Sequence, residues 1–272
     1  EATISVTTIG TGNVSATLDG NALAANSGLT VTPGAASPSQ TSVIAASAAE
    51  TVDNSVLITV QVRDQHGNNL ATDGDVVTVS TTGANTSLTA PAYAAAGAYT
   101  ADLSSTVPGP TTVSATLNGT AVTSTVDVTF GAGAPAGATS QITASSATMS
   151  TDDDVTISVQ LKDQYNNDAT GTSDVVLLSS SLTGSSIGAL TAQGAGLYTA
   201  TLTSTAVGDA EIAGTVNGNA IVDGVTIAIA PGAPVASQSV LTVTANTFTT
   251  DETITARVDL KDAYGNQTSG TT

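Results

Sequence analysis

Apolar and polar residues alternate along one stretch of the chain, and this alternation predicts a strand with one buried face. The apolar positions are Val56, Ile58, Val60 and Val62, and between them stand Leu57, Thr59, Gln61 and Arg63. Successive side chains of a strand point to opposite sides of a sheet, so a period of two predicts that the first set is buried. A helix would need apolar residues three and four apart, and no segment of adequate length shows that spacing.

The same alternation occurs twice more. The residues expected to point inward are Val155, Ile157, Val159 and Leu161, and then Ile254, Ala256, Val258 and Leu260. Further strands are expected at Ser42–Ala46, Val76–Ser80, Ala98–Leu103, Thr111–Leu117 and Ala121–Phe130. Asn118-Gly119 separates the last two and predicts a hairpin, because both residue types accept the positive φ that a tight turn needs. Asp19-Gly20 and Asn217-Gly218 predict the same turn.

A repeat of fixed length organises the chain. Arg63-Asp64, Lys162-Asp163 and Lys261-Asp262 recur at intervals of 99 residues. Other landmarks keep this interval, which places residues 1–32 at the end of a repeat, 33–131 and 132–230 as complete repeats, and 231–272 at the start of another. Because the chain begins and ends within a repeat, we expect further repeats to flank it. Proline and glycine at the boundaries predict short linkers.

The number and spacing of the expected strands indicate the fold class. Each repeat of roughly 100 residues holds about seven short strands with turns every 8–12 residues, which is typical of a two-sheet sandwich. The sequence therefore predicts an all-β protein made of tandem immunoglobulin-like β-sandwich domains.

Two motifs of each repeat resemble a known family. Val60-Gln61-Val62-Arg63-Asp64 with Gly67-Asn68, followed by Gly97-Ala98-Tyr99-Thr100-Ala101, resembles the bacterial Ig-like group 1 domain. The resemblance implies the stalk of invasin- and intimin-type adhesins and of other large bacterial surface proteins. Asn166 departs from the glycine found at 67 and 265, and we expect it to preserve the loop because asparagine tolerates a left-handed conformation. No segment resembles the lectin-like tip of such adhesins.

Charge and composition exclude several partners. The chain has 22 acidic and 4 basic residues, a formal net charge of −18 and no cysteine. Nucleic acids and anionic membrane surfaces attract basic proteins, so neither is an expected partner. No run of about 18 apolar residues is present, so this segment is not expected to insert into a membrane.

The sequence lacks the combination of nucleophile and base that catalysis by a serine enzyme needs. A serine nucleophile needs a base, which is usually histidine, and His66 is the only histidine. Tyrosine stands at 165 and 264, the positions in the other repeats that correspond to His66, so we interpret His66 as an ordinary loop residue. We expect Tyr99 and Tyr198 to have core or corner roles, and the loop residues Tyr165 and Tyr264 to cover domain junctions. The sequence predicts no enzyme and no catalytic residue.

The acidic run Asp152-Asp153-Asp154 has two interpretations. It can be a solvated turn, or it can bind Ca²⁺, which takes six to eight oxygen ligands. Sandwich geometry places the run near the linker at 231–232 and places Asp262 of the next repeat opposite it. The second interpretation therefore predicts an interdomain calcium site of Asp152, Asp153, Asp154 and Asp262.

The leading functional hypothesis is an extracellular spacer on a bacterial cell surface, in which the repeats project a functional tip. The expected partners are flanking Ig-like repeats of the same chain. The alternative is a subunit of a self-assembling filament or surface layer, with lateral or head-to-tail copies of the chain as partners. Edge strands rich in valine and threonine favour such pairing, whereas the charge of −18 opposes it.

Overall fold

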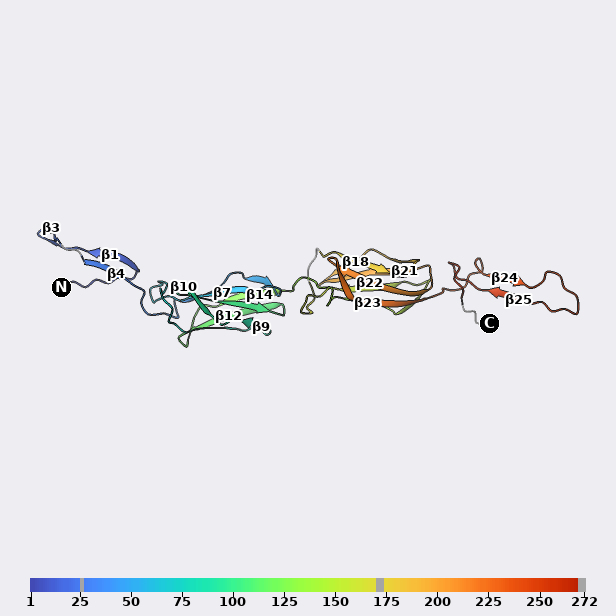
Figure 1. Ribbon diagram of the computed structural model, residues 1–272, viewed down its shortest axis with the longest axis horizontal. Coiled ribbons are helices and arrows are strands. Elements are labelled where there is room, and N and C mark those ends of the chain that lie inside the picture. The colour runs from blue at the N-terminus through green and yellow to red at the C-terminus, as the bar shows by residue number, and fades with distance from the viewer. Residues whose placement is uncertain (25–26, 170–173, 269–272) are drawn as a thin grey trace. The chain divides into compact units, whose positions relative to one another are not determined.

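The computed structural model describes residues 1–24, 27–169 and 174–268 (Figure 1). Within these ranges the chain forms strands, turns and loops and no helix, so it has no helix that could span a membrane. The chain divides into two compact units, Glu1–Ala132 and Gly133–Thr272. The prediction of an all-β fold is confirmed.

The first unit contains a sandwich preceded by two small antiparallel pairs, β1 with β4 and β2 with β3. Its strands are β1 (Gly10–Val14), β2 (Thr17–Leu18), β3 (Asn21–Ala22), β4 (Ser27–Val31), β5 (Ser42–Ala45), β6 (Ala49–Thr51), β7 (Val56–Gln61), β8 (Val77–Thr81), β9 (Thr86–Leu88), β10 (Ala92–Ala95), β11 (Ala98–Ser105), β12 (Gly109–Leu117), β13 (Thr120–Ala121) and β14 (Val126–Gly131). One sheet has the order β10-β11-β7-β5 with β9 on β11, and the other has the order β13-β12-β14-β6 with β8 on β12.

The second unit contains the next sandwich and one further antiparallel pair. Its strands are β15 (Gln141–Ala144), β16 (Thr148–Ser150), β17 (Val155–Gln160), β18 (Val176–Ser180), β19 (Ser185–Ile187), β20 (Thr191–Gly194), β21 (Leu197–Ser204), β22 (Gly208–Val216), β23 (Asn219–Ala230), β24 (Val240–Val243) and β25 (Ala256–Asp259). The order is β18-β22-β23-β15-β17-β21-β19, with β16 on β23 and β20 on β21. A single parallel bridge, Gln141 to Asp223, joins the two halves of this sheet.

Each complete repeat encloses its own apolar core. The eight residues predicted to be buried, Val56, Ile58, Val60, Val62, Val155, Ile157, Val159 and Leu161, are all at most 3% exposed. Tyr99 joins the first core, and its hydroxyl donates to Asp73 Oδ1 at 2.8 Å. Tyr198 packs half-buried against the second core. The predicted core positions and the structural role of both tyrosines are confirmed.

The turns have the backbone geometry that their residues predict. Asn118 and Gly119 have φ of 51° and 81°, and positive values recur at Asp19-Gly20 and Asn217-Gly218. Asn166 has φ of 69°, close to the 84° of Gly67 that it replaces. The left-handed conformation predicted for Asn166 is therefore confirmed.

The structure corrects two expectations. The strand expected at Ala121–Phe130 is split into β13 and β14, although its counterpart β23 is continuous. In the third repeat, Ile254 and Val258 are 36% and 58% exposed rather than buried. Residues 231–268, the part of this segment that the structure describes, form only opening strands of a repeat, and within them no second sheet covers β24 and β25.

Separate cores predict separate unfolding. Val159→Asp should unfold residues 132–230 while 33–131 stay folded, because a buried unpaired carboxylate costs several kcal/mol against a domain stability of about 5–15 kcal/mol. Calorimetry should show one of the two transitions lost. The control Thr156→Asp places the same charge on the exposed face of β17 and should leave both transitions in place. A single joint transition at lowered temperature in the Val159 variant would contradict independent cores.

Candidate functional site

A buried aspartate occurs three residues after a strand in each repeat. Asp64, Asp163 and Asp262 follow β7, β17 and β25, and their side chains are 1%, 0% and 0% exposed. Carboxylates are seldom fully buried unless hydrogen bonds replace the lost water. The surroundings of these three groups therefore show what holds the repeat boundary together.

The carboxylate of Asp163 binds the backbone on two sides. Its Oδ1 accepts the backbone N–H groups of Tyr165 at 2.9 Å and Asn167 at 3.0 Å, and Asn167 Nδ2 donates to both carboxylate oxygens. Its Oδ2 accepts the N–H of Gly133 at 2.9 Å. One side chain thus closes its own loop and fixes the first residues of the repeat.

The first unit contains the same arrangement. Asp64 Oδ1 accepts the N–H groups of His66 at 2.9 Å and Asn68 at 3.0 Å, and Oδ2 accepts the N–H of Gly34 at 3.0 Å. The His66 position contributes only its backbone N–H to Asp64, and the side chain is exposed. This geometry supports the interpretation of His66 as a loop residue.

The hydrogen bonds keep these carboxyl groups ionised. For Asp64, the Asn68 side chain is the main cause that holds the pKa well below the usual range, with the Gly34 N–H next. For Asp163, burial favours the neutral acid, but the bonds from Asn167, Gly133 and Tyr165 outweigh it and lower the pKa. For Asp262, the bonds from Asn266 and Thr151 outweigh burial in the same way.

Asp262 also reaches across a repeat boundary inside the second unit. Thr151, which follows β16, donates its hydroxyl to Asp262 Oδ2 at 2.7 Å. The N–H of Gly232 lies 2.8 Å from Thr151 Oγ1 and 3.2 Å from Asp262 Oδ2. Asp152 Oδ2 accepts the N–H of Ala233 at 2.6 Å. The linker is therefore bound by side chains of the repeat before it and of the repeat after it.

Gly232 lies very close to the side chain of Asp152. A Cβ on Gly232 would lie 2.4–2.5 Å from the carboxyl atoms of Asp152, well inside contact distance. A side chain at position 232 would therefore force the carboxyl group of Asp152, which bonds the N–H of Ala233, to move.

One further contact across a boundary occurs in both units. Asn266 Nδ2 donates to the carbonyl of Thr205 at 3.0 Å, and Asn68 Nδ2 donates to the carbonyl of Thr7 at 2.9 Å. Both pairs are 61 residues apart, and 198 residues, two full repeats, separate one pair from the other. The asparagine that supports the buried aspartate thus also binds the turn of the preceding repeat.

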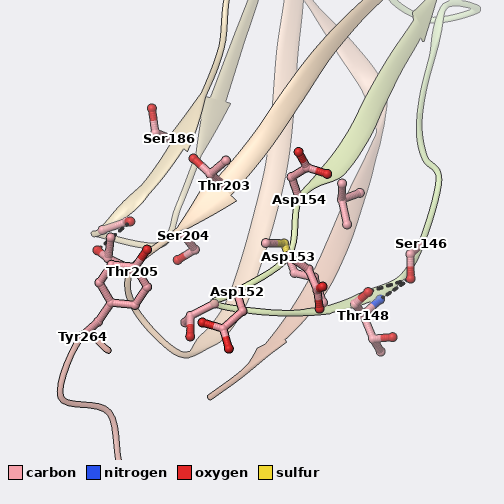
Figure 2. A pocket seen from close by; sticks show the side chains of 14 residues that line it. Ser146, Thr148, Asp152, Asp153, Asp154, Ser186, Thr203, Ser204, Thr205 and Tyr264 are labelled. Atoms are coloured by element: carbon pink, nitrogen blue, oxygen red, sulfur yellow. Dashed lines mark hydrogen bonds between the residues drawn. The ribbon is translucent and has the colours of Figure 1, made fainter. Parts of the chain in front are cut away.

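A groove lies at the boundary between the second sandwich and residues 231–272 (Figure 2). It is lined by Ser146, Thr148, Met149, Thr151, Asp152, Asp153, Asp154, Val155, Gly184, Ser186, Thr203, Ser204, Thr205 and Tyr264. Tyr264 forms one wall and stays 52% exposed. This position agrees with the expected role of Tyr264 at a junction. Tyr165, the corresponding residue of the preceding repeat, is 43% exposed.

The structure brings Asp152 and Asp262 to the same linker but gives each a hydrogen-bonding role. Asp153 accepts bonds from the hydroxyl and N–H of Ser150 at 2.7 and 3.2 Å, and Asp154 is exposed immediately before β17. Among the described residues, no group of three or more histidine, cysteine, aspartate or glutamate side chains is placed to hold a metal ion. Calcium binding by Asp152, Asp153, Asp154 and Asp262 stays a prediction without structural support.

Sequence reasoning missed the roles of Thr151 and of the buried aspartates. It used Asp64 and Asp163 as landmarks of the repeat and predicted Asp262 as a metal ligand. A signal was present: an asparagine follows each aspartate by four residues and a glycine precedes it by 30, in all three repeats. Thr151 had no such signal, because the corresponding residue of the first repeat is Val52.

Comparison with known proteins identifies the domain type. A family model described as invasin, domain 3 matches residues 35–133 and 136–232. The chain belongs to this family. The resemblance to invasin-type Ig-like domains is thereby confirmed, and it relates the chain to the adhesins of bacterial surfaces. A search of curated proteins gave no match.

Solved structures support the fold. FdeC, an Escherichia coli adhesin, is 22% identical with a TM-score of 0.60, over 88% of this chain and 79% of that one. InvD of Yersinia pseudotuberculosis is 27% identical with a TM-score of 0.54, over 84% and 72%. Invasin, a bacterial integrin-binding protein, is 23% identical with a TM-score of 0.56, over 93% and 53%.

Asp163→Asn should destabilise residues 132–230. An amide has one accepting oxygen, so its NH₂ group would face N–H donors that the carboxylate now satisfies, at a cost of about 1–3 kcal/mol. Denaturant unfolding measures the change. Asp168→Asn is the control, because Asp168 is an exposed partner of Lys162 and should change stability by less than about 0.5 kcal/mol. Equal effects of the two variants would contradict the role given to Asp163.

The lowered pKa values of Asp64 and Asp163 predict acid sensitivity. The folded-state pKa lies below the unfolded value of about 3.9, so the stabilisation is complete above that value and is lost as the pH falls through the folded-state pKa. The free energy of unfolding should therefore fall with pH below about 4. Asp163→Asn should flatten this slope for the second sandwich alone, and an unchanged slope would count against the assignment.

Proposed function

We propose that this chain is a spacer segment of a bacterial surface adhesin, in which tandem domains carry a functional tip away from the cell. The observation that carries the proposal is the bonded linker of the second unit. Gly232 and Ala233 are held by Thr151 and Asp152 of the repeat before them and by Asp262 of the repeat after them. A linker bound on both sides limits rotation between neighbours, and a spacer needs this property.

The separate cores suit the same role. Each complete repeat packs its apolar residues within itself, so the array can lengthen by adding units without redesigning a shared core. With strands of about 8–10 residues rising roughly 3.3 Å per residue, each domain adds on the order of 30 Å of reach. The net charge of −18 opposes contact between neighbouring copies.

Catalysis forms no part of the proposal. The only histidine is exposed in a loop, and the buried aspartates are saturated with hydrogen bonds from the backbone and from asparagine. A general acid or base must reach a substrate, and these groups are closed off from solvent.

The spacer proposal is tested by mass and scattering measurements on the full chain. A spacer should be an elongated monomer across a range of protein concentrations. Polymerisation at moderate ionic strength would favour the alternative, a self-assembling filament or surface-layer subunit. Repeating the measurements with calcium and with a chelator tests the calcium prediction separately.

The linker bonds make a prediction of their own. Thr151→Val removes the hydroxyl that bonds Gly232 and Asp262 and installs the residue found at position 52. Hydrogen exchange should show faster exchange of the Gly232 amide while the core amides of β17 are unchanged. Thr203→Val is the matched control, because it removes a hydroxyl from the same groove that makes no bond to Asp262. Unchanged exchange at Gly232 would remove the main support for a stiff junction.

A further inference from the structure

In each complete repeat, the segment near its start and the strand at its end lie side by side and run in the same direction. In the first unit β6 pairs with β14, with Ala49, Glu50 and Thr51 opposite Thr129, Phe130 and Gly131. In the second unit β16 pairs with β23, with Thr148, Met149 and Ser150 opposite Ala228, Ile229 and Ala230. Among the described strands of each sandwich, the other pairings are antiparallel, apart from the single parallel bridge between Gln141 and Asp223.

Backbone hydrogen bonds border both ends of each parallel pair. In the first unit Thr129 N–H donates to the Ala48 carbonyl at 2.9 Å, and Val52 N–H donates to the Gly131 carbonyl at 3.0 Å. The second unit repeats them 99 residues later, from Ala228 N–H to Ala147 at 2.9 Å and from Thr151 N–H to Ala230 at 3.0 Å. The four bonds show that the pairing is a repeated feature of the domain.

Apolar side chains cover the core side of these pairs. Val52 and Phe130 are each 2% exposed in the first unit. Met149 and Ile229 are 7% and 5% exposed in the second. Water therefore has poor access from that side to compete for the backbone bonds, and hydrogen bonds are stronger where water is excluded.

The direction of the strands decides how tension acts on them. Tension enters the first sandwich at β5 and must first break the antiparallel pairing of β5 with β7. It then acts on β6, and it leaves through β14 into the linker. Because β6 and β14 are parallel, the two forces pull them in opposite directions along their axes, and all the bonds between them carry load together. An antiparallel hairpin pulled at adjacent ends breaks its bonds one after another instead.

We propose that the β6–β14 and β16–β23 pairs are mechanical clamps that set the force at which each domain unfolds. The inference goes beyond the proposed function, because it concerns each sandwich by itself and holds whatever the array is attached to. Tension along the chain must break a clamp before the rest of that sandwich can open. The two clamps act independently, since each lies within one unit.

The test is single-molecule force spectroscopy on the full chain, held at its two ends. The wild type should give two unfolding events, each releasing roughly 300 Å of chain at about 3.3–3.6 Å per residue. Ala228→Pro removes the N–H that bonds Ala147 and should shift one of the two events to lower force. Thr129→Pro should shift the other event in the same way. Each variant carries an unaltered domain as its internal reference.

The chain supplies a matched proline control. Pro110 stands opposite Thr129 in the first unit, and Asp209 occupies the corresponding position opposite Ala228. Asp209→Pro therefore places proline in β22, the antiparallel neighbour of β23, and leaves the β16–β23 pair unaltered. The first repeat already has proline at this position. This variant should leave both unfolding forces unchanged.

A second measurement avoids any folding defect of the proline variants. The chain has no cysteine, so Asp209→Cys with Ala230→Cys defines two attachment points at adjacent ends of β22 and β23. Pulling there opens the antiparallel pair bond by bond, and the unfolding force should be lower than between the chain ends. Equal forces in the two directions would overturn the clamp, as would folded Ala228→Pro protein with an unshifted event.

The outcomes separate the clamp from the spacer role. A chain that polymerises in solution but keeps the directional difference in force would retain the clamp and lose the spacer proposal. An elongated monomer without that difference would retain the spacer and lose the clamp.

Discussion

The boundary architecture depends on a buried carboxylate that accepts several N–H donors. Asp64, Asp163 and Asp262 replace lost water with bonds from their own loop and from the start of their repeat. The groups that satisfy the charge are backbone amides fixed in place, so the carboxylate makes loop and linker a single structural element. At Asp262 that element includes Thr151 of the preceding repeat. In a protein without cysteine, an ionised side chain thus links the loop to the start of the repeat.

Much of the fold could be predicted because its determinants are local in the sequence. The period-two alternation identified the buried faces of β7 and β17, and the left-handed Asn166 followed from the glycine positions of the other repeats. The exposure of Val258 could not be predicted from the alternation, because burial requires a covering sheet, and the described residues 231–268 form none. The strands β6 and β16 were missed because three residues give no measurable period and their partner lies far along the chain.

The candidate site was predicted in position, and the calcium chemistry proposed for it stays a prediction. Sandwich geometry correctly brought the run beginning at Asp152 to the linker at Gly232 and placed Asp262 there as well. Sequence analysis left two interpretations of the acidic run open, a solvated turn and a calcium site. In the structure, backbone N–H groups of the linker donate to the carboxylates of Asp152 and Asp262. Every residue except proline has such a donor, so the amino-acid types in the sequence do not reveal these bonds.

The pairing of β6 with β14 also constrains the order in which a domain can form. Ala49 meets Thr129, a partner 80 residues later, so the contact has a high sequence separation and closes a long loop. During synthesis, the first sheet has its strands well before β14 emerges. The sandwich stays open at that edge until its final residues arrive, and only then does the fold close. A chain of such repeats therefore completes its domains one at a time, each in step with the arrival of its own last strand.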